Sequence, residues 1–336
     1  MEAFFLVKNG SADVAFERRA ISLKQPEALE VAIEVEAFGL NFADVTARLG
    51  LYRDCPPLPT VVGYEVVGRI TETGSDVNNV SKGDRVIAFT RFGGYATHVV
   101  TDSRGVAKIE EDYPVGKALA LGVQYTTAYF SAEMASSLNP GEKVLIQAAA
   151  GGVGTALVQL CKHKGCKIYG TAGSEEKLAY LRNQGVDVPI NYRTQDFSEV
   201  IKEDLDVVYD SIGGSTFKKG FKLLGPGGRM VSFGAASQLD AGNFFSKIRF
   251  GLSFGFYHPV QFIMNSKSLS GVNMLRIADH KQHLLQHAIE QVAQLAKEGK
   301  IDPYVGGVYP ASQLNEAHTA LEKRKTMGKI GIVWEE

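Results

Sequence analysis

The chain has 336 residues, of which 45% are hydrophobic, 22% charged and 10% aromatic, and its formal net charge is -1 at pH 7. These values are typical of a globular protein and exclude a disordered or fibrous chain. At about 100–200 residues per domain, the length predicts two domains. The small net charge argues against a general attraction to nucleic acid, so we expect no nucleic-acid partner.

The cysteines and the first residues indicate a cytoplasmic protein. Cys55, Cys161 and Cys166 are few, odd in number and without framework spacing, which favours a reducing compartment over a secreted disulfide fold. Residues 1–8 lack the basic start and long apolar core of a signal peptide, and we interpret them as a first strand.

No apolar run reaches the ~18 residues that a transmembrane helix needs. The nearest candidate, residues 244–264, is aromatic and apolar but contains Lys247, Arg249 and His258. Its role stays open at this point: a lid, a subunit contact or a peripheral membrane contact would each suit its composition.

The sequence predicts a compact β domain for the first 123 residues. Residues 29–38 alternate between apolar and polar side chains, as a half-buried strand does, and turns that contain glycine separate further short strand candidates. These candidates are residues 66–73, 84–89 and 95–100.

The pattern changes after Gly122 to strands that alternate with helices, which predicts βαβ units and a parallel sheet. We assign residues 124–265 to this nucleotide-binding domain and residues 266–336 to a return into the first domain. The predicted strands are 143–147, 167–171, 207–210, 229–233 and 329–333, and the predicted helices are 125–136, 153–164, 175–183, 282–297 and 313–325.

The strongest motif lies in residues 144–170, where a buried strand, a tight turn of small residues, a helix and a second strand follow one another. Small residues let the backbone approach a pyrophosphate, and the N–H groups at the helix start favour its charge. Gly154 lets the helix pack closely, although Ala149 stands where the first glycine of G-x-G-x-x-G is expected. The context predicts a dinucleotide site formed by Ala150, Gly151, Gly152 and Val153.

The end of the second strand favours NADP(H) over NAD(H). An NAD site places a carboxylate there for the ribose 2′-hydroxyl, whereas this chain has Gly173 and Ser174, with Lys177 one turn further on. A hydroxyl and an ammonium suit a 2′-phosphate, and Tyr192 and Arg193 could close around it. Lys177 alone would be an ordinary solvated lysine.

These motifs resemble the medium-chain dehydrogenase/reductase superfamily over nearly the whole chain. FGLNFADVTARLGLY (38–52) and PTVVGYEVVGRI (59–70) are similar to the start of quinone oxidoreductases, and QAAAGGVG (147–154), VVYDSIGG (207–214) and MVSFG (230–234) to their nucleotide domain. Within this branch, the group of the synaptic-vesicle amine-transport-protein homologue looks closest. The resemblance implies an α/β protein with a GroES-like β domain and an inserted Rossmann domain, an active site in the cleft between them, and a homodimer joined through the nucleotide domains.

Zinc is where the sequence departs from relatives of the alcohol-dehydrogenase type. Those enzymes place a cysteine and a His–Glu pair in the matched segments, where this chain has Asn41 and Tyr64-Glu65, and it lacks their four clustered cysteines. An amide and a phenol do not replace zinc ligands. His280, His283 and His287 have the spacing of one helical face, but such spacing is also that of a solvated face, so we expect no metal site.

Without a metal to stabilise an alkoxide, a quinone or an α,β-unsaturated carbonyl compound is the expected substrate, because its conjugated oxygen accepts the charge with a few donors. By resemblance, Asn41, Asp44 and Tyr52 border the nicotinamide. Tyr52 would donate to the substrate carbonyl, Asn41 would position the ribose or the substrate, and Asp44 would orient its neighbours. The alternatives are that Asp44 only caps a helix and that Tyr52 only fills a wall. The remaining cofactor contacts are assigned to Thr127, Ser211 and Phe233.

The sequence therefore predicts an NADPH-dependent, zinc-independent quinone or enone oxidoreductase. The alternative is an NADP(H)-binding protein of low turnover that acts at a membrane surface or with a lipid or protein partner. Whether one or two electrons are transferred stays open.

Overall fold

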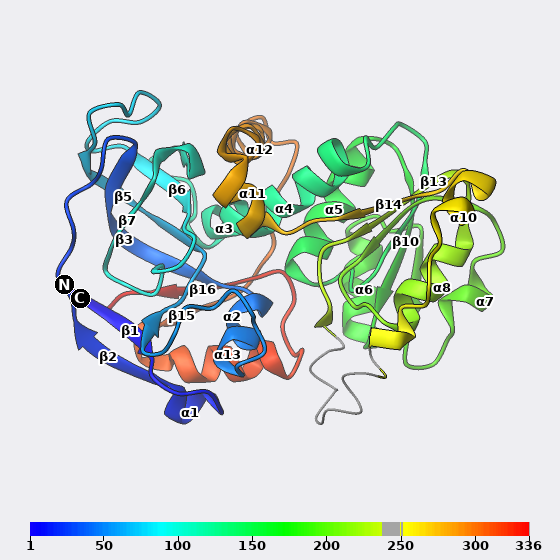
Figure 1. Cartoon of the computed structure of the whole chain (residues 1–336), viewed down its shortest axis with the longest axis horizontal. Coiled ribbons are helices and arrows are strands. Elements are labelled where there is room, and N and C mark those ends of the chain that lie inside the picture. The colour runs from blue at the N-terminus through cyan, green and yellow to red at the C-terminus, as the bar shows by residue number, and fades with distance from the viewer. Residues whose placement is uncertain (237–248, 250, 336) are drawn as a thin grey trace. The chain divides into compact units, whose positions relative to one another are not determined.

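The computed structural model describes residues 1–236, 249 and 251–335 (Figure 1). The chain forms two compact units. The β unit comprises residues 1–126 and 274–336, and the α/β unit comprises residues 127–273. Because the β unit contains both ends of the chain, the α/β unit is an insertion, as predicted. Residues 244–248 and 250 of the aromatic segment lie outside the described residues.

Among the described residues, the strands of the β unit form a seven-stranded sheet and a three-stranded sheet. In the larger sheet the order is β15-β16-β3-β5-β6-β8, with β7 paired to β3, and in the smaller it is β2-β1-β4. The strands are β1 (Glu2–Leu6), β2 (Phe16–Ala20), β3 (Glu30–Leu40), β4 (Thr60–Val61), β5 (Glu65–Thr73), β6 (Arg85–Phe89), β7 (His98–Asp102), β8 (Val106–Lys108), β15 (Val305–Pro310) and β16 (Lys329–Val333).

The core of the β unit lies against β3, which is buried along most of its length, Ile33 and Phe38 completely. The last strand, β16, pairs antiparallel with β3, and Ile330 is opposite Leu40. This register brings the end of the chain to the segment that follows β3, where two of the predicted catalytic residues lie.

The helices of the β unit are α1 (Ala12–Ala15), α2 (Phe42–Arg48), α3 (Val115–Ala120), α11 (Met274–His280), α12 (Gln282–Lys297) and α13 (Leu314–Glu322). After α3 the helical backbone continues through η2 (Leu121–Tyr125), α4 (Thr126–Tyr129) and η3 (Phe130–Ala135). The three histidines whose spacing is that of one helical face do not share a helix. His280 ends α11, whereas His283 and His287 belong to α12, because Lys281 between them has φ -141° and ψ 52°.

The α/β unit contains a parallel sheet in the order β11-β10-β9-β12-β13-β14. This is the order 3-2-1-4-5-6 of a Rossmann fold, which confirms the predicted doubly wound sheet. Its strands are β9 (Lys143–Ile146), β10 (Lys167–Ala172), β11 (Val188–Asn191), β12 (Leu205–Asp210), β13 (Leu224–Ser232) and β14 (Ser268–Gly271). Its helices include α5 (Gly152–His163), α6 (Glu175–Asn183), α7 (Phe197–Val200), α8 (Ser215–Leu223) and α10 (Pro259–Asn265).

Helices α5 and α6 pack on β9, β10 and β11, and α8 packs on β12 and β13 (Figure 1). One apolar core of this unit combines strand residues with Phe197 of α7 and Phe217 of α8, and it includes Leu145, Val208 and Met230, all completely buried. The sheet changes winding direction between β9 and β12, and in such sheets ligands bind outside the carboxyl ends of the strands at this point.

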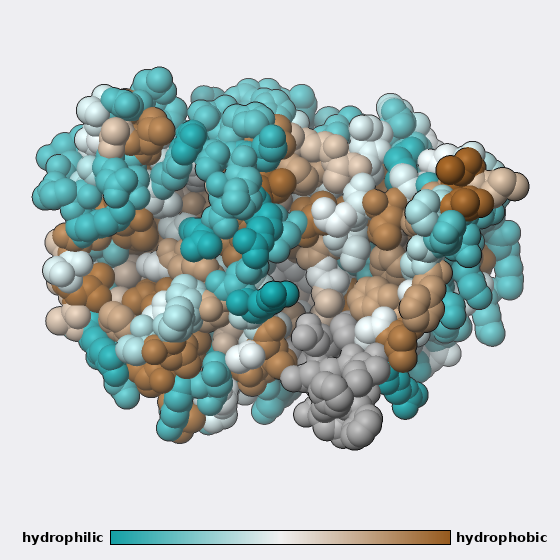
Figure 2. Space-filling view, in the orientation of Figure 1, coloured by the Kyte–Doolittle hydropathy of each residue, from teal (hydrophilic) through white to brown (hydrophobic). Residues whose placement is uncertain are grey.

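The segment around α10 carries apolar side chains on the surface. Phe256, Ile263 and Met264 are 85%, 76% and 78% exposed, and α10 itself has no buried residue. Figure 2 shows the brown apolar surface at the place of α10, at the upper right. In the described part of the chain, no helix combines the length and the apolar character that crossing a membrane would require.

Candidate functional site

The turn between β9 and α5 is held by a small set of hydrogen bonds. Thr171 Oγ1 accepts from the backbone N–H of Ala148 (3.1 Å) and donates to Gln147 Oε1 (2.8 Å). The N–H of Ala149 donates to the Thr171 carbonyl (2.9 Å), and Ala148 has a positive φ of 51°. The second strand of the motif therefore fixes the turn from the side.

Gly154 is required by close packing in this turn. A Cβ there would lie 2.3 Å from the Ala148 carbonyl oxygen and 2.7 Å from Ala149 Cα. A Cβ at Gly151 would have only the Ala148 oxygen nearby, at 3.2 Å. These distances agree with the role expected for Gly154, close packing of the helix, and they leave the backbone of Gly151 accessible from one side.

Helix α5 begins without a side-chain cap. Its N-cap residue is Gly151, no side chain of the described residues accepts from the first N–H groups, and the first turn contains no acidic residue. The N–H groups of the first turn have no partner within the helix, and with the helix dipole they attract an anion. The start of α5 therefore has the properties of a phosphate site.

The residues predicted to select the dinucleotide lie together at the carboxyl end of β10. Ser174 is the N-cap of α6, and its hydroxyl oxygen accepts from the backbone N–H of Lys177 (3.3 Å). The Tyr192 hydroxyl lies over Gly173, since a Cβ at Gly173 would be 2.4 Å from it. Tyr192 is 46% exposed. The sequence did not identify the capping role of Ser174, although S-E-E-K before a helix is an N-cap pattern; the hydroxyl proton stays available to an acceptor.

Ser211 and Phe233 follow β12 and β13 directly, so they lie at the same carboxyl edge of the sheet as the phosphate turn. Beside them, Asp210 Oδ2 accepts from the N–H of Gly213 (2.9 Å), and burial raises the pKa of Asp210 to about 6. Thr127 belongs to α4 and is 8% exposed.

In the β unit, Asn41 and Asp44 form the start of α2. The N–H of Asn41 donates to Asp44 Oδ2 (2.8 Å), and the N–H of Asp44 donates to the Asn41 carbonyl (3.0 Å). The first bond is the Asp44 half of a capping box, so Asp44 does cap the helix, as the alternative interpretation holds. Asp44 is completely buried, and burial raises its pKa to about 8.

Tyr52 and Tyr64 lie side by side with Phe92. The ring centroids of Tyr52 and Tyr64 are 6.0 Å apart in an edge-to-face arrangement, and those of Tyr64 and Phe92 are 5.3 Å apart. Burial raises the pKa of Tyr52 to about 12 and that of Tyr64 further. Tyr64 is 2% exposed, and its hydroxyl has no hydrogen-bond partner among the described residues. An O–H group is thus held beside Tyr52 and stays protonated at neutral pH.

Glu65 and Lys329 form a completely buried ion pair beside Asn41, with both side chains 0% exposed. Glu65 Oε1 also accepts from Asn41 Nδ2 (2.8 Å), and Glu65 Oε2 accepts from the N–H of Val123 (2.6 Å). The pair is not apparent from the sequence because its partners are 264 residues apart. Two sequence features could have indicated buried charges: a lysine begins the apolar stretch KIGIV, and a glutamate begins the apolar stretch EVVGRI.

The side chains at the zinc-ligand positions of the resemblance contact one another or their neighbours within the chain. Asn41 and Glu65 bond to each other, and Tyr64 packs between Tyr52 and Phe92. Over the described ranges there is no group of three or more His, Cys, Asp or Glu side chains that could hold a metal ion. Cys161 and Cys166 are buried, and Cys55 is half-buried.

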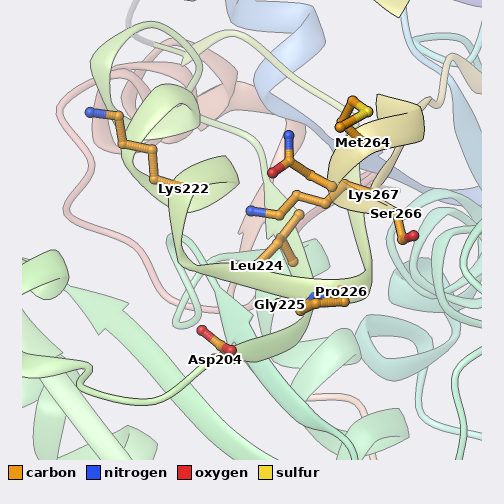
Figure 3. Close-up of a pocket in the computed structure, with 9 residues that line it drawn as sticks. Asp204, Lys222, Leu224, Gly225, Pro226, Met264, Ser266 and Lys267 are labelled. Carbon is orange, nitrogen blue, oxygen red and sulfur yellow. The ribbon is translucent and has the colours of Figure 1, made fainter. Parts of the chain in front are cut away.

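A pocket of about 380 Å³ lies at the amino ends of the strands of the parallel sheet, opposite the carboxyl ends described above (Figure 3). Asp204 precedes β12, Leu224, Gly225 and Pro226 begin β13, and Lys267 precedes β14. The pocket is therefore at the amino ends of these strands, away from the phosphate turn, and it is not part of the candidate site.

Two family models match the chain: an alcohol dehydrogenase GroES-like domain over residues 27–111 and a zinc-binding dehydrogenase domain over residues 152–298. The synaptic vesicle membrane protein VAT-1 homolog of Danio rerio is 35% identical over 313 residues, which are 91% of this chain and 64% of that protein. This chain thus spans just under two thirds of the zebrafish relative. Quinone oxidoreductase-like protein 2 of Bos taurus is 31% identical over 307 residues, 90% of this chain and 84% of that protein.

Two solved structures resemble the fold over nearly its full length. The Escherichia coli quinone oxidoreductase, a complex with NADPH, has a TM-score of 0.85 and 27% identity, and covers 99% of this chain and 100% of that chain. The CurK enoyl reductase has a TM-score of 0.85 and 28% identity, and covers 99% of each chain. Both agree with the predicted α/β architecture of a GroES-like and a Rossmann-type domain.

Proposed function

We propose that this chain, which belongs to the medium-chain dehydrogenase/reductase superfamily, is an NADPH-dependent, zinc-independent reductase that delivers hydride to a quinone or an α,β-unsaturated carbonyl compound. The observation that carries the proposal is the uncapped start of α5 at the switch point of the sheet, beside a β10 end without a carboxylate. The names of the similar proteins, a quinone oxidoreductase with NADPH and an enoyl reductase, support it.

The residues present fit the proposed cofactor. The backbone of residues 150–153 would hold the pyrophosphate, and Gly173, Ser174, Lys177 and Tyr192 would surround the 2′-phosphate. Thr127, Ser211 and Phe233 would contact the remainder. When bound, NADPH supplies the hydride, and the protein contributes position and polarity.

The chain's own contribution to the reaction is stabilisation of the substrate oxygen. Burial keeps Tyr52 in its protonated form, so its O–H donates to an oxygen that gains charge and does not act as a base at neutral pH. The Tyr64 hydroxyl, whose ring packs against Tyr52, is a second donor of the same kind. Asn41 positions the substrate or the ribose, and Asp44 holds the backbone of Asn41.

The experiment is a fluorescence titration with NADPH and NADH. A second assay on the same protein then measures NADPH oxidation, as loss of its absorbance, with a panel of small quinones and enones. We expect tighter binding of NADPH, turnover with at least one compound, and a lower kcat for Tyr52→Phe and Asn41→Ala. Tyr113→Phe is the matched control, since Tyr113 is also a half-buried tyrosine of the β unit whose pKa burial raises to about 12. Full turnover in both site variants would refute the site, and no binding of either nucleotide would refute the function.

A second candidate function is supported by the exposed apolar side chains around α10. Here the chain would bind NADP(H) with little turnover and act at a membrane surface or with a lipid or protein partner. Phe256, Ile263 and Met264 project into solvent, and the zebrafish relative is named a synaptic vesicle membrane protein. Co-sedimentation with anionic liposomes that is lost in Ile263→Ser/Met264→Ser would support this candidate, and no co-sedimentation at physiological salt would contradict it.

We also propose a homodimer joined through the α/β units. Within the described strands, β14 is the last of the parallel sheet and pairs only with β13, so one edge is open to a second copy. Sedimentation equilibrium tests this: a monomer at micromolar concentration would contradict it. The cytoplasmic location stays a prediction.

A further inference from the structure

The ion pair formed by Glu65 and Lys329 is completely buried, which makes it costly for the fold. Both side chains are 0% exposed, and taking two charges out of water costs several kcal/mol per ion, which their attraction repays only with excellent geometry. Replacing such a pair by apolar residues of similar size is often neutral for stability. A buried pair of this kind therefore calls for an explanation in terms of what it positions.

The pair holds the two ends of one carboxamide. Asn41 Nδ2 donates to Glu65 Oε1 (2.8 Å), and Lys329 Nζ lies 3.4 Å from Asn41 Oδ1. Lys329 also donates to Glu65 Oε1 and to the Leu40 carbonyl (3.2 Å). The negative partner thus meets the amide nitrogen and the positive partner meets the amide oxygen, so rotating the amide by 180° would reverse both contacts.

The backbone around the pair is shaped to admit it. A Cβ at Gly39 would lie 2.2 Å from Glu65 Oε1 and 2.5 Å from Lys329 Nζ. On the other side, a Cβ at Gly122 would be 3.0 Å from Glu65 Cβ and 3.1 Å from Glu65 Oε2. Two glycines from distant parts of the chain therefore leave the space that the charged groups occupy.

We propose that Glu65 and Lys329 are positioning residues that fix the orientation of the Asn41 carboxamide for catalysis. The proposal rests on the proposed function of Asn41. The second Nδ2–H of Asn41 is not used by Glu65, and fixing the amide directs this donor toward the substrate or ribose before either binds. The pair acts through Asn41 and touches neither reactant.

The test is a double-mutant cycle between the pair and Asn41. The variant Glu65→Gln/Lys329→Met removes both charges at similar volume, and we expect it to lower kcat by about 10- to 100-fold while the Kd for NADPH stays within twofold. In the Asn41→Ala background the same two substitutions should lower kcat no further. The matched control is Glu36→Gln/Arg85→Met, which removes another ion pair of the β unit and should leave kcat unchanged. Losses that multiply in the cycle would overturn the proposal.

A second readout separates this proposal from the proposed function. In protein labelled with 15N at asparagine, the Asn41 side-chain amide protons should exchange slowly with solvent and should exchange at least tenfold faster in the charge-free variant. Slow exchange without turnover on any substrate would refute the reductase and leave the positioning role standing. Turnover with equal exchange rates in both proteins would refute the positioning role alone. If the double variant does not fold, Glu65→Gln alone takes its place in both measurements.

Discussion

Substitution of Gly154 by alanine tests the phosphate turn most directly. The added Cβ would lie 2.3 Å from the Ala148 carbonyl oxygen, 2.7 Å from Ala149 Cα and 2.9 Å from the Ala149 carbonyl carbon. All three are backbone atoms, so no side-chain rotation relieves the contacts and the turn itself must move. In Gly151→Ala the only close contact is with the Ala148 oxygen, at 3.2 Å, and a shift of a few tenths of an ångström accommodates it.

The two variants should therefore differ in stability. Overpacking of this kind costs about 1–3 kcal/mol, while alanine within a helix returns up to about 1 kcal/mol relative to glycine, so we expect Gly154→Ala to lose about 1–2 kcal/mol. Gly151→Ala changes only an N-cap, where the loss should be below about 1 kcal/mol.

Urea unfolding measures the two stabilities, and fluorescence titration of the folded proteins measures NADPH binding. Since the turn must open to accept the methyl group, we expect the Kd of Gly154→Ala for NADPH to rise at least tenfold. Wild-type stability together with a wild-type Kd in Gly154→Ala would refute the assignment of this turn as the phosphate site.

Three further predictions concern one cofactor contact and two buried titratable groups. Lys177→Ala should weaken NADPH binding about five- to tenfold and leave NADH binding unchanged, which titration with both nucleotides would reveal; equal losses would remove Lys177 from the 2′-phosphate site. Burial raises the pKa of Asp44 to about 8, so its contribution to stability is fully present below its ordinary pKa of 3.8 and is lost as pH rises through 8. Asp44→Asn should therefore flatten the fall in unfolding free energy between pH 5 and 8, which in the parent is at most about 1.4 kcal/mol per pH unit for this group; identical pH slopes would contradict this. Burial lowers the pKa of His318 to about 3, so its contribution to stability is present above its ordinary pKa of 6.5 and is lost as the pH falls toward 3. His318→Gln should therefore lose less unfolding free energy than the parent between pH 7 and 5, which urea unfolding measures.

The sequence predicts the parts of this fold that depend on near neighbours. Helices α6 and α12 and strand β16 begin and end at the predicted residues, because periodicity, an N-cap and flanking glycines all act within a few positions. Strand β7 begins at His98 rather than at Tyr95, since the backbone of Tyr95 is hydrogen-bonded to Phe4 and Val62 instead. The turn between β9 and α5, for which we propose phosphate binding, is equally local.

The candidate site of the β unit is predictable only in part. Asn41 and Asp44 stand three positions apart, and their capping box follows from that spacing. Lys329 reaches Asn41 only because β16 pairs with β3, a contact across almost the whole chain. A lysine in a sequence is expected to be solvated by default, so nothing in its immediate surroundings predicts complete burial.

The absence of zinc ligands has a physical consequence for the chemistry of this site. At the positions where the resemblance implies a cysteine and a His–Glu pair, the carboxylate of Glu65 is neutralised by the ammonium of Lys329, and Asn41 is held between them. A divalent cation would have to displace that ammonium and would still meet an amide and a phenol, which are weak zinc ligands. In the proposed reaction, charge on a substrate oxygen would then be stabilised by O–H and N–H donors, for which we propose Tyr52, Tyr64 and Asn41. Such donors suffice where conjugation spreads the charge, and for this reason we propose a quinone or an enone, rather than a simple alcohol, as the substrate.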